Sequence, residues 1–309
     1  MAGVIPPHFP DAAAEDWSEF YEQLPETGTL LGVYTNWADS EQLASRPPAV
    51  FEAVSGPTSA LGVTVVAAVG IHRTAGRGVV EPTLRLGDDD DEAALLTAVD
   101  ALARGQHPAY LAIGAEVNLL AAADPDAFER FVSLYRRAYD TVKEASPGTL
   151  VFTIFQYEHL HGGAFLMDGV RDRPPTLDLI ERFEGKLDLL GLTTYPFFDY
   201  ESPADLPDDY YEDVLALAGV PLAFTEIGWP AAPLISAPDS GFGGTPEEQA
   251  DFVDRFRDLI AGLDVEIALW SFPNDPAGVG APFESVALRD NSGNPRPALA
   301  RWQSLGSGD

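Results

Sequence analysis

The sequence contains no cysteine and very little lysine. Across 309 residues the missing thiol excludes disulfides and thiolate chemistry. Of the 18 basic residues only Lys143 and Lys186 are lysine, and 49 acidic residues give a net charge of −31. A surface of this sign should repel nucleic acid and anionic membranes. We interpret it as solubility chemistry, and a salt-loving source and an acidic mesophilic surface are both open hypotheses.

Long apolar runs are also missing. No stretch approaches the roughly 18 apolar residues of a membrane helix, and the N-terminus lacks the basic and apolar regions of a secretory signal. The compartment stays open, with an extracellular protein whose signal has been removed favoured over a cytoplasmic one. We expect a monomer that needs no cofactor or metal, with a carbohydrate as its partner.

Short apolar segments of strand length alternate with amphipathic helices along the chain. Apolar runs without polar alternation are typical of parallel strands covered on both faces. We predict eight strands, at Gly3–Ile5, Thr29–Thr35, Val63–Val69, Ala109–Asn118, Leu150–Phe155, Leu187–Thr194, Leu222–Thr225 and Val265–Trp270. Helices are predicted at Asp11–Leu24, Ala49–Val54, Leu177–Phe183, Asp213–Ala218 and Ala298–Trp302, and after Asp88, Asp124 and Thr245. Regular βα units with no composition break predict an α/β fold, a single (β/α)8 TIM barrel over residues 1–309.

Polar and aromatic residues follow the strands, where the active sites of such barrels are found. They are Asn36, Trp37, His72, Glu116, Asn118, Gln156, Glu158, Tyr195, Glu226, Trp229 and Trp270. Carboxylates and aromatic rings dominate, a combination suited to sugar stacking and glycoside hydrolysis. Phosphate chemistry would need a glycine-rich loop with lysine or arginine, which is missing at the strand ends.

Four motifs resemble those of the clan of retaining TIM-barrel glycosidases that includes cellulases and arabinogalactan endo-β-1,4-galactanases. They are Ile113–Asn118, Gly191–Phe198, Phe224–Trp229 and Ala268–Ser271. The resemblance implies that Glu116 is the acid/base and Glu226 the nucleophile. It also implies that Tyr195 lies beside the nucleophile and that Trp270 floors the sugar site. Two residues of the clan are missing: Ala115 replaces the asparagine before the acid/base, and Leu31–Trp37 holds no arginine.

Several of these residues have a structural alternative. Glu158 could contact substrate or form a salt bridge, and His72 could line the cleft or pack beneath it. Trp37 and Trp229 could be sugar platforms or rim packing. His159 and His161 have metal-like spacing but too few partners, so a loop pair is favoured. The acidic run Asp88–Glu92 is interpreted as favouring a helix N-terminus rather than binding calcium.

The expected reaction is double displacement with Glu226 attacking and Glu116 transferring protons. The alternative is a non-catalytic carbohydrate-binding barrel, motivated by the missing asparagine and arginine. A barrel enzyme of unrelated chemistry would be indicated if the two carboxylates lay far apart. Linkage and chain length depend on loops such as Pro233–Gly244.

Overall fold

The computed structural model describes residues 2–5, 14–37, 46–75, 79–163, 173–233, 243–276 and 283–307. Of the predicted substrate-shaping loop Pro233–Gly244, residues 234–242 lie outside this described part, as do residues 11–13 of the first predicted helix.

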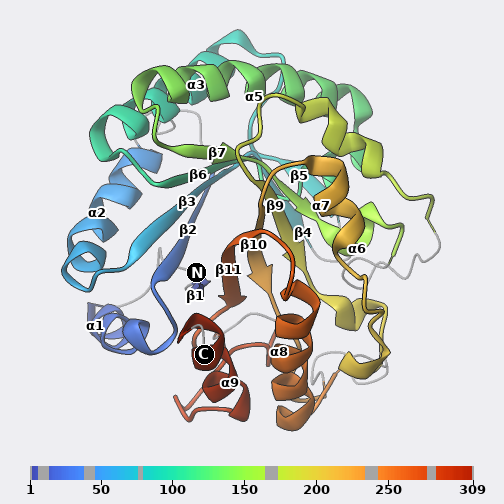
Figure 1. The fold of residues 1–309 in the computed structure, drawn as a ribbon. Coiled ribbons are helices and arrows are strands. Elements are labelled where there is room, and N and C mark those ends of the chain that lie inside the picture. The colour runs from blue at the N-terminus through green and yellow to red at the C-terminus, as the bar shows by residue number, and fades with distance from the viewer. Residues whose placement is uncertain are drawn as a thin grey trace.

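One sheet of parallel strands forms the centre of the molecule (Figure 1). Its order is β7-β6-β3-β2-β1-β11-β10-β9-β8. The strands are β1 (Ala2–Ile5), β2 (Leu30–Asn36), β3 (Thr64–Gly70), β6 (Tyr110–Ile113), β7 (Leu150–Phe152), β8 (Ile154–Gln156), β9 (Leu190–Thr194), β10 (Leu222–Ile227) and β11 (Val265–Ser271). Because β7 and β8 are successive pieces of one strand, separated only by Thr153, the two ends of the order meet. The predicted (β/α)8 barrel is confirmed.

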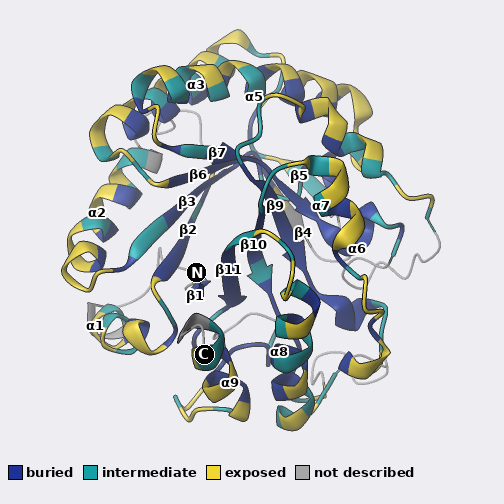
Figure 2. Cartoon of the chain, in the orientation of Figure 1, coloured by how far each residue is buried: buried dark blue, intermediate teal, exposed yellow. Residues whose placement is uncertain are grey.

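Helices surround the sheet (Figure 1). They are α1 (Ala14–Gln23), α2 (Arg46–Ala60), α3 (Asp89–Gln106), α4 (Val117–Ala123), α5 (Pro125–Ala145), α6 (Tyr157–Leu160), α7 (Glu212–Ala218), α8 (Pro246–Ile260) and α9 (Pro297–Ser307). The long helices expose their outer sides and bury apolar stripes against the strands (Figure 2). Helix α5 shows this pattern well, since Phe128, Phe131 and Tyr135 recur at helical spacing and are all buried.

Apolar side chains fill both sides of the sheet. A small cluster that includes Val66, Ala112 and Leu269 lies on the inner face of the barrel. A larger cluster packs between the outer face and the helices. Strand residues are therefore apolar in both directions, which explains why polar alternation is missing from the sequence.

The helix starts behave as the sequence predicts. The side chains of Asp88, Asp124 and Thr245 each accept a hydrogen bond from a backbone N–H in the first turn of α3, α5 and α8. The residues Asp89–Glu92 occupy the first turn of α3, where negative charge is favoured by the helix dipole.

Several elements differ from the prediction. The fifth strand is divided at Thr153, and the segment Leu177–Phe183 is a 3-10 helix, η5, rather than an α-helix. Helix α2 runs well beyond Ala49–Val54 at both ends. The short helices α4 and α6 and an antiparallel hairpin, β4 (His72–Ala75) with β5 (Val79–Pro82), were not predicted. All but α2 lie next to strand ends, where tertiary contacts override local propensity.

Candidate active site

Glu116 lies in an unusual backbone conformation directly after β6. Its φ and ψ are 50° and 43°, in the left-handed region, and it begins α4. A non-glycine residue there costs about 1–3 kcal/mol and persists only when the surroundings enforce it. Gly114, two residues earlier, also has positive φ, and a side chain there would collide with Phe131 and Val117. The tight turn after β6 therefore aims one carboxylate at the mouth of the barrel.

Glu226 is aimed by an irregularity in β10. The register of β10 shifts between Phe224 and Glu226 against β9, and between Phe224 and Ile227 against β11. A bulge of this kind re-directs a side chain and is common beside active sites. The Thr225 hydroxyl, donating to the backbone oxygen of Leu192 at 3.1 Å, fixes the bulge against β9.

Strand β9 contacts both carboxylates. The Thr193 hydroxyl donates to Glu116 Oε1 at 2.8 Å, and the Tyr195 hydroxyl donates to Glu226 Oε2 at 2.7 Å. Thr193 also lies opposite Glu226 in the ladder. Residues two apart at a strand end point to the same side, so this strand brings the two glutamates into one site.

The two carboxylates hold their protons more tightly than ordinary glutamates. Burial, followed by the negative charge of Glu226, raises the pKa of Glu116 to about 8. Burial raises the pKa of Glu226 to about 7, and the hydrogen bond from Tyr195 opposes that rise. Both side chains remain partly exposed, so a ligand can reach them. Repulsion between neighbouring carboxylates separates their titrations and favours one proton on Glu116.

Three further side chains lie at this site and were not selected from the sequence. The Tyr34 hydroxyl donates to the backbone oxygen of Thr225 at 3.1 Å, and Ser271 Oγ lies 2.7 Å from the Tyr195 hydroxyl. The ring of Phe283, partly exposed, meets Tyr195 edge-on at 4.9 Å. Strand phase could have indicated Ser271, because it is the neighbour of an outward-facing tryptophan. Phe283 follows β11 in a segment with no pattern.

Asn118, Gln156 and Glu158 form a buried hydrogen-bond network. Asn118 binds both backbone polar groups of Gln156, at 2.9 and 2.8 Å, and the Gln156 amide donates to Glu158 at 2.5 Å. Glu158 also accepts from the Thr194 hydroxyl at 2.7 Å and from the Tyr195 backbone N–H at 3.1 Å. Burial raises the pKa of Glu158 to about 7. The network positions the ends of β8 and β9, and direct substrate contact by its members stays a prediction.

The tryptophans do not lie where a sugar platform would. Trp37, Trp229 and Trp270 are at most 1% exposed. Trp270 stacks against Trp302 of α9 and Phe252 of α8, and its indole N–H donates to the Val286 oxygen at 2.8 Å. Its ring therefore faces the helices, and the prediction that it floors the sugar site is wrong for this arrangement. Trp229 likewise packs on Phe252, at 5.2 Å, so rim packing describes it better than a platform.

The remaining predicted residues are spread around the strand ends. Asn36 is exposed at the end of β2, whereas His72 is buried in β4. Burial lowers the pKa of His72 to about 4, so its imidazole is neutral. His161 pairs with Asp213 at 2.7 Å, while His159 Nδ1 lies 3.4 Å from the Asn118 amide. Within the described ranges, no group of three or more histidine or acidic side chains is arranged to hold a metal ion.

Comparisons with known proteins agree on the fold. No family model and no curated protein matches the sequence. Among solved structures, GH5_18 from Streptomyces cattleya in complex with Manβ1-4GlcNAc has a TM-score of 0.72 and 16% identity, covering 99% of this chain and 79% of that one. The exo-β-1,4-mannosidase Op5Man5 from Opitutaceae bacterium strain TAV5 has a TM-score of 0.65 and 15% identity, with 99% and 59% covered.

A third similar structure is an active-site mutant of Rhizomucor miehei β-1,3-glucanosyltransferase in complex with laminaritriose. Its TM-score is 0.61 at 15% identity, and the alignment covers 96% of this chain and 95% of that one. At such identities these likenesses establish the barrel architecture. In the described part of the chain, no helix has the length and apolarity to cross a membrane.

Proposed function

We propose that this protein is a glycoside hydrolase that cleaves β-linked glycosides by retaining double displacement. Glu226 is the nucleophile and Glu116 the acid/base. The observation that carries the proposal is the pair of hydrogen bonds from β9, Thr193 to Glu116 and Tyr195 to Glu226, which gathers two partly buried carboxylates at the mouth of one barrel. The structural likeness to carbohydrate-active enzymes supports the same class.

The protonation states fit the two roles. Tyr195 favours the ionised form of Glu226, which attacks the anomeric carbon. Glu116, with the higher pKa, carries the proton that goes to the leaving oxygen. Once Glu226 is esterified by the sugar, its negative charge is gone, and the pKa of Glu116 falls. Glu116 can then take a proton from the water that releases the sugar.

The neutral donors of the site have positioning roles in this scheme. Tyr195 is held from two sides, by Ser271 at its hydroxyl and by Glu158 at its backbone N–H. Tyr34 ties β2 to the bulge at Thr225. Asn36 at the rim and the partly exposed Phe283 ring beside Tyr195 are the candidates for contact with the sugar.

The test is a hydrolysis screen on aryl β-mannosides, β-glucosides, β-galactosides and the matching oligosaccharides. Wild type should release a sugar whose first-formed anomer is β, seen by proton NMR. Glu116→Gln and Glu226→Gln should each lower kcat by at least about 10²-fold while sugar binding survives. Binding without cleavage by wild type across the screen would support the carbohydrate-binding barrel instead. An α first product would indicate inversion.

A further inference from the structure

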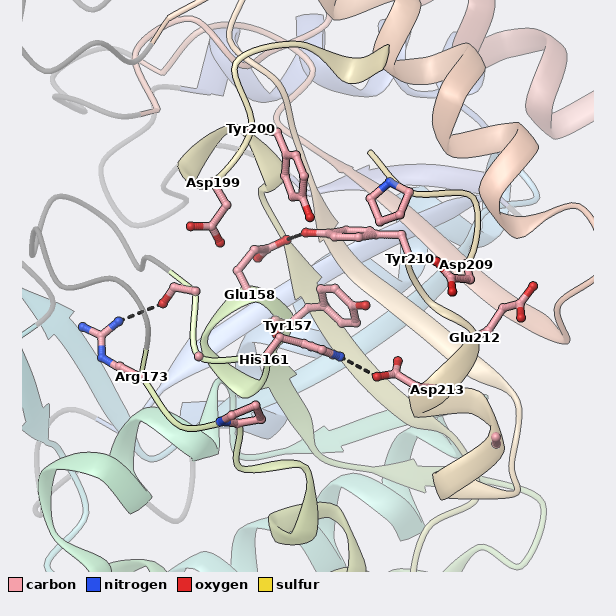
Figure 3. A pocket seen from close by; sticks show the side chains of 15 residues that line it. Tyr157, Glu158, His161, Arg173, Asp199, Tyr200, Asp209, Tyr210, Glu212 and Asp213 are labelled. Atoms are coloured by element: carbon pink, nitrogen blue, oxygen red, sulfur yellow. Dashed lines mark hydrogen bonds and ion pairs between the residues drawn. The ribbon is translucent and has the colours of Figure 1, made fainter. Parts of the chain in front are cut away.

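A second concave region lies beside the candidate active site (Figure 3). This recess has a volume of about 1060 Å³, at the upper end of the range for small-molecule sites. Fifteen residues line it, and they come from three segments: Tyr157–Gly163 with α6, the stretch after β9 with Asp199 and Tyr200, and the residues that lead into α7.

The recess and the carboxylate pair lie on opposite sides of the end of β9. Successive side chains of a strand point to opposite faces. Thr193 accordingly reaches Glu116, whereas Thr194 reaches Glu158, which lines the recess. Glu158 also accepts the Tyr195 backbone N–H, so this one side chain borders both regions. The recess is therefore a separate cavity that shares a wall with the site.

Aromatic rings form part of the recess wall. Tyr200 and Tyr210 are partly exposed and meet edge-on with their ring centroids 5.7 Å apart. The Tyr210 hydroxyl donates to Glu158 Oε1 at 3.3 Å, which fixes its ring against the buried network. Rings held in this way offer apolar faces to a sugar and negative faces to a cation.

Charge selects among possible occupants. The lining carries five carboxylates, on Glu158, Asp199, Asp209, Glu212 and Asp213, against one guanidinium, Arg173, and one imidazole, His161. His161 is paired with Asp213, and Arg173 donates to the Gly163 oxygen at 2.8 Å. The recess should thus repel uronic, sulfated or phosphorylated sugars and attract a cation.

We propose that this recess binds a saccharide unit that carries a protonated amine, independently of the carboxylate pair. The aromatic rings receive the faces of the sugar, and the carboxylates around them receive its ammonium and hydroxyl groups. Neither the charge nor the rings alone define the ligand, since an acidic surface occurs elsewhere on this chain whereas this combination with a cavity is local to the recess.

The binding experiment uses calorimetry at pH 6 and low salt with three probes. They are the β-1,4-linked glucosamine disaccharide, its N,N′-diacetyl form, and cyclohexylamine. The amino disaccharide should bind at least about fivefold more tightly than either of the others, and more weakly when salt is raised. Equal binding of the diacetyl form would overturn the amine preference, and equal binding of cyclohexylamine would overturn the sugar assignment.

Variants locate the binding. Asp209→Asn with Glu212→Gln should weaken binding of the amino disaccharide by about fivefold or more. The matched control, Glu247→Gln with Asp251→Asn, removes the same charge from exposed positions on α8 and should change it less than about twofold. Equal effects would mean that only overall charge matters. Tyr200→Ala should weaken binding at unchanged net charge.

A final variant separates this proposal from the hydrolase proposal. Glu226→Gln should leave amino-disaccharide affinity unchanged, because the recess lies on the other side of β9. Loss of binding in that variant would place the ligand at the carboxylate pair and overturn the recess site. The measurement needs no turnover, so an inactive protein with a functional recess and an active protein without one give different results.

Discussion

The Tyr195 hydroxyl lies 2.7 Å from Glu226 Oε2 and 2.7 Å from Ser271 Oγ, so one phenol connects strands β10 and β11 through β9. A phenol that donates to a carboxylate stabilises its ionised form. The hydrogen bond therefore keeps the pKa of Glu226 below that of Glu116 although both groups lie in the same partly buried site.

Tyr195→Phe should raise the pKa of Glu226, because the carboxylate loses its donor. The acidic limb of the kcat/KM profile, which reports the free enzyme, should shift to higher pH, with kcat lowered about 10- to 100-fold. Tyr34→Phe is the matched control: its hydroxyl bonds a backbone oxygen, so it should leave the limb in place. An unmoved limb in Tyr195→Phe would count against Glu226 as the group that must be ionised.

Thr193→Val should act on the other limb. The Thr193 hydroxyl stabilises ionised Glu116, so its loss should raise the pKa of Glu116 and extend activity to higher pH. Thr225→Val removes a buried hydroxyl that bonds the Leu192 oxygen instead, and should reduce stability without moving either limb. The measurement is kcat/KM against pH for both variants. A shift in the acidic limb of Thr193→Val would reverse the assigned roles.

Glu116→Gln should stabilise the fold at high pH. The folded pKa of about 8 lies above the ordinary 4.5, so the contribution of this group is present below the lower value and is lost as pH rises through the higher one. Glutamine does not titrate and can still accept from Thr193. Allowing for partial exposure, we expect a gain in unfolding free energy of about 1–2 kcal/mol at pH 9.

The gain should shrink steadily as pH is lowered from 9 to 5.5, followed by thermal unfolding of wild type and Glu116→Gln side by side. Glu144→Gln, an exposed change of the same kind on α5, is the control and should show little pH-dependent difference. A constant difference across the range would mean that Glu116 titrates normally in the folded protein.

Trp270→Phe tests whether this ring is core or platform. Because it packs between Phe252 and Trp302 and loses a hydrogen bond to Val286 when replaced, we expect a loss of about 1–3 kcal/mol in unfolding free energy. The KM of a hydrolysed glycoside should stay within about twofold. A large rise in KM with little loss of stability would restore the sugar-platform role.

The barrel could be predicted from the sequence because both faces of its strands are apolar, so each strand stands out as an uninterrupted run. The two glutamates could be predicted for the same reason, since each ends such a run. The division of the fifth strand at Thr153 could not, because β7 and β8 pair with different neighbours. That is a property of the closed sheet and has no local signal.

The facing of side chains at the strand ends was also beyond the sequence. Whether Trp270 or Ser271 points into the barrel depends on the phase of β11, and an apolar run with no alternation does not reveal phase. The bulge at Thr225 adds a second uncertainty, since it re-aims Glu226 by one position. Tyr34 lies within its predicted strand, yet its contact with Thr225 O joins residues 191 positions apart.

The most direct measurement is mass spectrometry of the protein treated with the activated 2-deoxy-2-fluoro derivative of whichever glycoside it hydrolyses. The electron-withdrawing fluorine slows the second step, so a retaining enzyme accumulates its glycosyl intermediate. The account predicts one added sugar per chain on the peptide that contains Glu226, and none in Glu226→Gln. A sugar attached to any other residue, or turnover with no adduct and an inverted product, would contradict it.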